Sequence, residues 1–93
     1  MTEIIVPTIH PNGDTAKTLI EQLLSVRNAL VSTTGALRDA APNARNYYPQ
    51  GDMAFTAARN QYNRRMDALL NIQDEILADL RGIQKQKGAN HVE

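Results

Sequence analysis

The residues best suited to chemistry lie in one connecting segment, residues 42–51, which separates two long amphipathic stretches. Adjacent tyrosines offer flat faces on which a nucleobase can stack, and an arginine offers a planar fork that fits a phosphate or a guanine edge. Amide side chains add donors and acceptors for a base edge. The candidate ligand-binding residues of this segment are Asn43, Arg45, Tyr47, Tyr48 and Gln50. The set suits a nucleotide, although one tyrosine could equally plug the end of a helix pair while the other residues hold the turn.

Arginines gather around this segment although the formal net charge of the chain is zero. Residues 38–65 contain five arginines and two aspartates, whereas residues 66–80 contain four acidic residues and no basic one. Such an arrangement favours a small anionic ligand near the segment, with Arg45 and Arg59 as its contacts. Staggered packing of two helix pairs, positive end over negative middle, explains Arg64 and Arg65 slightly better.

A second polar turn, His10-Pro11-Asn12-Gly13-Asp14, precedes the first amphipathic stretch. His10 and Asn12 could present their side chains beside the free N–H groups of a helix N-terminus, which is a common site for anions. The alternative is a plain helix cap, with Asp14 or Thr15 in the N-cap position.

Signatures of catalysis are missing from the sequence. It has no cysteine, two widely separated histidines, no Ser-His-acid spacing and no glycine-rich phosphate loop. Asp74-Glu75 is interpreted as a solvated face, and Met66, Leu69 and Leu70 as core. We therefore expect no enzyme activity, no metal and no other cofactor. Balanced charge also argues against binding to duplex nucleic acid.

The first of the two stretches predicts a helix over residues 14–41, because its apolar positions advance by alternating fours and threes. This predicted seam consists of Leu19, Leu23, Val26, Leu30, Thr33, Leu37 and Ala40. Ile20, Leu24 and Val31 lie beside it. The run Ser32-Thr33-Thr34-Gly35 has poor helix propensity, so a bend or a close helix contact is expected there.

The second stretch predicts a helix over residues 52–87, capped by Asp52 and followed by a polar tail at 88–93. Its predicted inner face consists of Phe55, Ala58, Tyr62, Met66, Leu69, Ile72, Ile76, Leu80 and Ile83, with Leu70 and Leu77 on its flank. Residues 1–13 are expected to form an extended arm and turn, because Pro7 and β-branched residues disfavour a helix.

These elements predict a single all-α domain over residues 1–93: two long antiparallel helices in a hairpin with an extended N-terminal arm. Both apolar stripes are wider than one partner helix would cover, so we expect an oligomeric helix bundle, either a dimer or a tetramer. The two polar turns should lie at opposite ends of the hairpin, so a ligand that met both would have to sit between protomers. The chain also lacks an apolar run of 18 residues and a signal-peptide pattern, so no membrane partner is expected.

The turns I-H-P-N-G-D-T-A and A-A-P-N-A-R-N-Y-Y-P-Q-G, followed by A-R-N-Q-Y, resemble a family of small phage and prophage proteins. The resemblance covers roughly residues 9–80, and Y-Y-P-Q-G is its most specific part. Members often carry Thr where this chain has Asp14, which preserves the capping role. The resemblance implies a phage protein.

Small helical phage proteins of this kind are similar to anti-defence sponges, which sequester the cyclic oligonucleotides of bacterial CBASS immunity without cleaving them. That similarity implies a cyclic dinucleotide or related ligand in the cytoplasm of the infected host. Tyr47 and Tyr48 would stack on bases, and Arg45 and Arg59 would meet phosphates or guanine edges. Base edges would be read by Asn12, Asn43 and Gln50. The alternative is a phage structural or regulatory protein that contacts another protein and has no small-molecule ligand.

Overall fold

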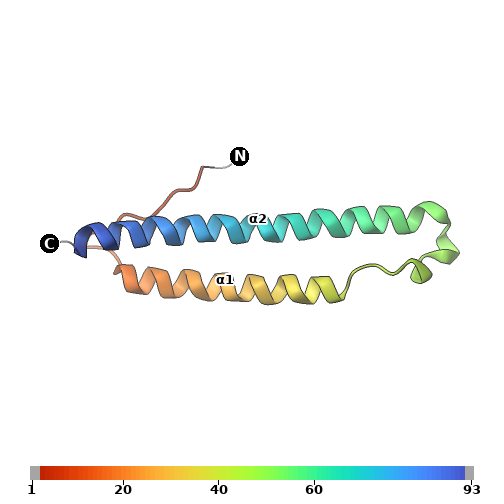
Figure 1. Cartoon of the computed structure of the whole chain (residues 1–93), viewed down its shortest axis with the longest axis horizontal. Coiled ribbons are helices and arrows are strands. Elements are labelled where there is room, and N and C mark those ends of the chain that lie inside the picture. Colours follow the sequence, from red (N-terminus) through yellow and green to blue (C-terminus); the bar gives the residue numbers. More distant parts are fainter. Residues whose placement is uncertain (1–2, 92–93) are drawn as a thin grey trace.

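Two long helices make up most of the computed structural model, which describes residues 3–91 and the side chains of residues 3–88. Helix α1 spans Ala16–Asp39 and helix α2 spans Asp52–His91, with the short 3-10 helices η1 (Ala44–Asn46) and η2 (Tyr48–Gln50) between them. No strand occurs in the described range. The predicted all-α fold with two long helices is therefore confirmed. Figure 1 shows α1 and α2 side by side, with the chain turning back between them at one end.

Helix α1 begins after Thr15, whose Oγ1 accepts a hydrogen bond of 3.1 Å from the backbone N–H of Thr18. Thr15 rather than Asp14 is thus the N-cap, and the helix ends at Asp39 rather than at 41. Ala40 has already left helical geometry, with φ −96° and ψ 14°, shortly before Pro42. The threonines at 33 and 34 lie within the helix, and their hydroxyls donate to the carbonyls four residues earlier.

The contact between the helices differs from the predicted seam by a rotation of α1. Leu23, Leu30 and Leu37 are partly buried as expected, but Val26 is 44% exposed and Thr33 is exposed. Their places in the contact are taken by the next residues along the chain, Arg27 and Thr34, and Thr34 is only 5% exposed. The predicted seam is therefore wrong at Val26 and Thr33, and also at Ala40, which is exposed beyond the end of α1. The close helix contact expected in the Ser-Thr run lies at Thr34.

Helix α2 departs from its predicted inner face at one position, and the other members of that face are half-buried or buried. Ile72, predicted on the inner face, is 43% exposed, and the neighbouring Gln73 lies half-buried in its place. The Gln73 Nε2 donates a hydrogen bond of 2.7 Å to Thr34 Oγ1 on α1. Leu70, interpreted as core, is also 43% exposed. A polar pair that is satisfied across the contact thus takes the positions predicted for Thr33 on α1 and Ile72 on α2.

Most apolar side chains keep contact with solvent. Leu80 and Ile83, at 3% and 0% exposure, are the buried apolar residues of the described chain. The molecule measures 66 × 24 × 20 Å and its radius of gyration is 19.3 Å, against about 12 Å expected for a compact domain of this length. Its accessible surface of 7138 Å² also exceeds the roughly 5,400 Å² expected for its mass. A single copy therefore buries little of its apolar surface.

The N-terminal arm lies against the final part of α2 (Figure 1). The side-chain amide of Gln86 binds the arm at two points: its Nε2 donates to the Pro7 carbonyl at 2.8 Å, and its Oε1 accepts from the Ile9 N–H at 2.9 Å. Val6 packs directly on Gly82, where a methyl group would lie 2.7 Å from its Cγ1. Neither Gln86 nor Gly82 was predicted from the sequence to contact the arm.

Helix α2 continues past the predicted end at residue 87 and reaches His91. Gly88 does not end it, since a helical glycine costs only about 1 kcal/mol relative to alanine. The predicted polar tail is therefore wrong up to residue 91, and residues 92–93 lie outside the described range. Across residues 3–91, neither helix combines the length and apolar character that a membrane span requires.

Candidate functional site

The segment between the helices is built by local capping. The Asn43 Oδ1 accepts a hydrogen bond of 3.2 Å from the backbone N–H of Arg45, which starts η1. Gly51 then has φ +99°, a left-handed conformation that glycine adopts without strain. The Gly51 carbonyl accepts a hydrogen bond from the Ala54 N–H. Gly51 is therefore the residue directly before the helix, the position that was predicted for Asp52. Asp52 is instead the first residue of α2, where its charge suits the helix dipole.

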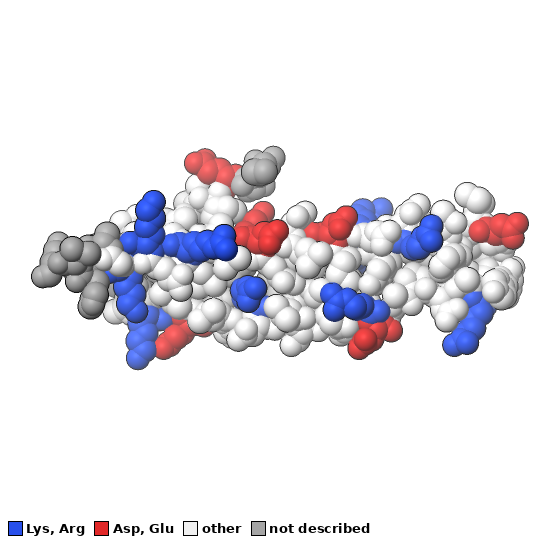
Figure 2. Space-filling model, viewed as in Figure 1, with Lys and Arg blue, Asp and Glu red and all other residues white. Residues whose placement is uncertain are grey.

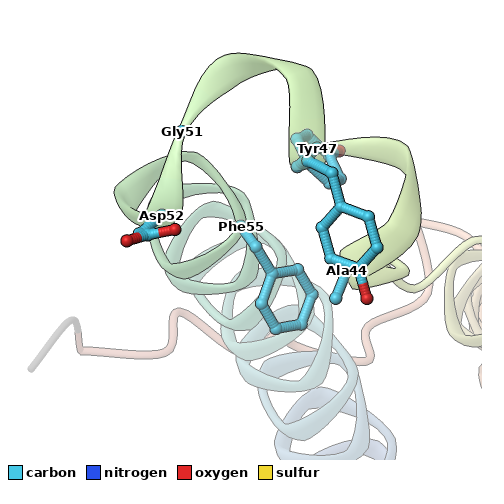
Figure 3. Close-up of a pocket in the computed structure, with 6 residues that line it drawn as sticks. Ala44, Tyr47, Gly51, Asp52 and Phe55 are labelled. Carbon is cyan, nitrogen blue, oxygen red and sulfur yellow. The ribbon is translucent and has the colours of Figure 1, made fainter.

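An aromatic hollow lies where this segment meets α2. The ring centroids of Tyr47 and Phe55 are 6.3 Å apart with the planes tilted by 49°. Beside them is a hollow of about 400 Å³, lined by Ala44, Tyr47, Tyr48, Gly51, Asp52 and Phe55. In Figure 3 the Phe55 side chain points between Asp52 and the part of the segment that carries Ala44 and Tyr47. The hollow therefore has aromatic walls and one carboxylate in its lining.

The two tyrosines have different environments. Tyr47 is half-buried against Phe55, in the position of a side chain that closes the end of the helix pair. Tyr48 is 74% exposed although it lines the same hollow. An exposed aromatic ring beside a hollow is available for stacking on a flat ligand, so Tyr47 is suited to packing and Tyr48 to binding.

Charges of both signs lie near the hollow. The guanidinium carbon of Arg59 is 5.7 Å from the centroid of the Phe55 ring, within the range of a cation–π interaction. Asp52, two turns before Arg59 on α2, contributes a carboxylate to the lining. A carboxylate accepts hydrogen bonds from base N–H groups or ribose hydroxyls, whereas the guanidinium attracts phosphate. The arrangement fits a ligand with a donor edge and a separate anionic part.

The remaining predicted residues lie outside the lining. Asn43, Arg45 and Gln50 are exposed in the same segment. His10 and Asn12 lie in the turn before α1, at the opposite end of the molecule (Figure 1). The structure thus joins Tyr47 and Tyr48 in one hollow with Arg59 beside it, and separates His10 and Asn12 from that hollow.

The turn before α1 is closed on itself. His10 Nδ1 accepts a hydrogen bond of 3.3 Å from the Asn12 backbone N–H, and the imidazole folds over Gly13, where a methyl group would lie 2.8 Å from Nε2. The Gly13 N–H also donates to the His10 carbonyl at 3.1 Å. His10 therefore stabilises its own turn.

Two residues of the hollow, Asp52 and Phe55, were predicted only as a cap and as part of an inner helix face. Their position in the first turn of α2 indicates their role, because side chains there face the segment that leads into the helix. In the described part of the chain, no group of three or more His, Asp or Glu side chains is placed to hold a metal ion.

The chain matches no protein-family model, no curated protein and no solved structure.

Proposed function

We propose that the chain is a phage anti-defence protein that binds a cyclic oligonucleotide immune signal, such as a cyclic dinucleotide, and sequesters it without cleavage. The observation that carries this proposal is the hollow between Tyr48 and Phe55, with Asp52 in its lining and Arg59 beside it. Aromatic faces, one acceptor and a neighbouring guanidinium are the groups that a base, its donor edge and a phosphate require.

The size of the hollow agrees with one nucleotide unit. Its volume of about 400 Å³ lies at the lower end of the roughly 300–1,000 Å³ typical of small-molecule sites. One base of the ligand would stack against Tyr48, and Asp52 would accept from its donor edge. The phosphates would extend over Arg59 and towards Arg45. His10 and Asn12 would join such a site only from a second copy of the chain.

The exposed apolar surface supports the further proposal that antiparallel hairpins assemble as a dimer or tetramer. Large apolar side chains on both helices are between 43% and 48% exposed: Leu24, Val26, Val31, Leu70 and Ile72. Covering those on one side of the helix pair, Leu24, Val31 and Leu70, with a second copy would add burial that one hairpin lacks.

The alternative function is a phage structural or regulatory module that docks on another protein. The observation that favours it is the exposure of Ile5 on the arm and Met53 at the loop end, at 79% and 74%. Isolated exposed apolar residues are common on soluble proteins, however, and neither residue lines the hollow. The residues of the hollow therefore favour nucleotide binding over protein docking.

The test is titration calorimetry of the pure protein with cyclic di-GMP, cyclic di-AMP and cyclic GMP–AMP. At least one should bind with micromolar or tighter affinity and be recovered intact by mass spectrometry after heat release. Tyr48→Ala should weaken that binding and Tyr48→Phe, which keeps the ring, should largely retain it. Failure of all three ligands to bind would refute a cyclic-dinucleotide site, and recovery of linear product would indicate an enzyme.

A further inference from the structure

One side of the helix pair carries an apolar strip that the single chain leaves uncovered. On α2, Leu70 and Leu77 each lie three residues before a contact residue, Gln73 and Leu80. A step of three residues at 100° each rotates both leucines towards the same side of the helix. Leu70 is 43% exposed and Leu77 is half-buried.

Helix α1 contributes to the same side. Leu24 and Val31 each follow a contact residue, Leu23 and Leu30, and are 43% and 48% exposed. Because the chain returns along α2 (Figure 1), a forward rotation on α1 and one on α2 lead to the same side of the pair. We name Leu24, Val31, Leu70 and Leu77 the apolar strip. Ile72 immediately precedes Gln73 and lies on the opposite side.

The charged residues that border the strip on α2 change sign near Leu77. Asp67 and Asp74 precede this leucine, and Arg81 and Lys85 follow it; all four are exposed. Figure 2 shows the same order over α2, with basic side chains towards its C-terminal end and acidic ones over its middle. A surface that is acidic on one side of a point and basic on the other is complementary to its own copy turned by 180° about that point.

We infer that the apolar strip is the contact surface for a second copy of this chain, with a two-fold axis close to Leu77. Around such an axis Asp74 lies opposite the partner's Arg81, and Asp67 lies within one turn of the partner's Lys85. The four residues of the apolar strip lie around the level of Leu77, so the strip of one copy packs against the strip of its partner. The order of acidic residues, leucine and basic residues along α2 is that expected for one half of a symmetric antiparallel interface.

Helix α1 agrees with the same axis. The Thr34–Gln73 hydrogen bond sets the two helices level at these residues. Leu77, one turn after Gln73, is therefore level with Leu30, one turn before Thr34. Leu24 and Val31, the members of the strip on α1, lie within two turns of Leu30 and are therefore close to the level of this axis.

The dimensions suit a stable dimer. A standard interface buries about 800 Å² per partner, and the broad face of a molecule measuring 66 × 24 Å offers more than this. Leu77 lies past the midpoint of α2, so the loop end of each copy would extend beyond its partner by roughly 16 Å at 1.5 Å per residue. The hollow at Tyr48 therefore stays open in the dimer, and the dimer interface is separate from the proposed nucleotide site.

Single cysteines test the axis, because the natural chain has none. Leu77→Cys lies near the axis and should form a disulfide between copies under mild oxidation, giving a band of about twice 10.3 kDa on a non-reducing gel. Ile72→Cys is the matched control on the opposite side of the same helix and should stay monomeric on that gel. Equal cross-linking of both variants, or of Ile72→Cys alone, would overturn the inference.

Charge exchange tests the register. Asp74→Arg and Arg81→Asp should each weaken the dimer roughly tenfold in sedimentation equilibrium, since each places like charges together twice. The double variant D74R/R81D should regain most of the affinity, because the two-fold axis restores both pairs. A double variant weaker than either single variant would contradict this register. Circular dichroism checks that each variant is helical, and all measurements omit nucleotide, so their outcome is separate from the fate of the binding proposal.

Discussion

Gln73 donates a hydrogen bond of 2.7 Å to the hydroxyl of Thr34, which in turn donates to the Leu30 carbonyl at 2.8 Å. This polar link between α1 and α2 lies where the predicted faces contained Thr33 on α1 and Ile72 on α2. A hydrogen bond in a partly buried contact stabilises one register over its neighbours, because a shift takes the acceptor on α1 away from the Gln73 amide.

The link should behave as a coupled pair. Thr34→Val alone removes the acceptor of Gln73 and should lower the free energy of unfolding by about 1–3 kcal/mol. Combining it with Gln73→Leu should restore much of this stability, because no buried polar group is then left unsatisfied. Urea denaturation of both single variants and the double variant measures the coupling, and purely additive effects would show that the link does not set the register.

The two tyrosines should separate binding from packing. Tyr48→Ala should cost about 1–3 kcal/mol of nucleotide affinity while leaving thermal stability unchanged, because this ring is 74% exposed. Tyr47→Ala should lower both affinity and thermal stability, since an aromatic pair contributes about 0.5–1.5 kcal/mol beyond its buried area. Calorimetry and a thermal melt distinguish the effects. Equal loss of stability in both variants would assign both rings to packing.

Arg59 should provide an electrostatic contribution to binding. Arg59→Gln keeps a long polar side chain beside Phe55 but removes the charge, so affinity for an anionic nucleotide should fall several-fold and depend less on salt. Arg64→Gln on the same helix is the matched control and should bind like the parent. A salt dependence that is identical in the parent and Arg59→Gln would argue against a phosphate contact at this arginine.

The N-terminal arm should be released by a single methyl group. Gly82→Ala places a carbon within 2.7 Å of Val6, so the arm must shift, and its cleavage by a protease of broad specificity should accelerate. Gly35→Ala is the matched control: its methyl group meets nothing within 4 Å in the chain, and it should stabilise α1 by about 0.5–1 kcal/mol. Unchanged proteolysis of Gly82→Ala would show that the arm does not depend on this contact.

The turn before α1 should not be needed for binding by the hollow. Asn12→Ala keeps the backbone N–H that donates to His10, so the turn should persist and nucleotide affinity should be retained. A binding-deficient but folded Asn12→Ala would instead indicate a site shared between copies. In that case, refolding it together with Tyr47→Ala should restore a fraction of the sites.

The sequence by itself determined the two helices, the arm and the polar segment between the helices. Their signals are local: apolar spacing of three and four, a capping residue at Asp14 or Thr15, and prolines at 42 and 49 that interrupt helical geometry. The candidate residues of the segment followed from side-chain chemistry alone. The end of α2 was misplaced, because a glycine near a helix terminus permits a stop without enforcing it.

The tertiary structure decided which face of each helix turns inward. On α1, one possible contact face contains Val26 and Thr33, and the other contains Arg27 and Thr34. Both faces contain Leu23, Leu30 and Leu37, so the spacing of apolar residues could not distinguish them. The choice depends on Gln73, which is 39 residues from Thr34 in the chain. Gln86 and the arm meet across 77 and 79 residues. The hollow likewise forms only when the segment folds back onto Asp52 and Phe55, because its walls come from parts of the chain whose relative position no local pattern encodes.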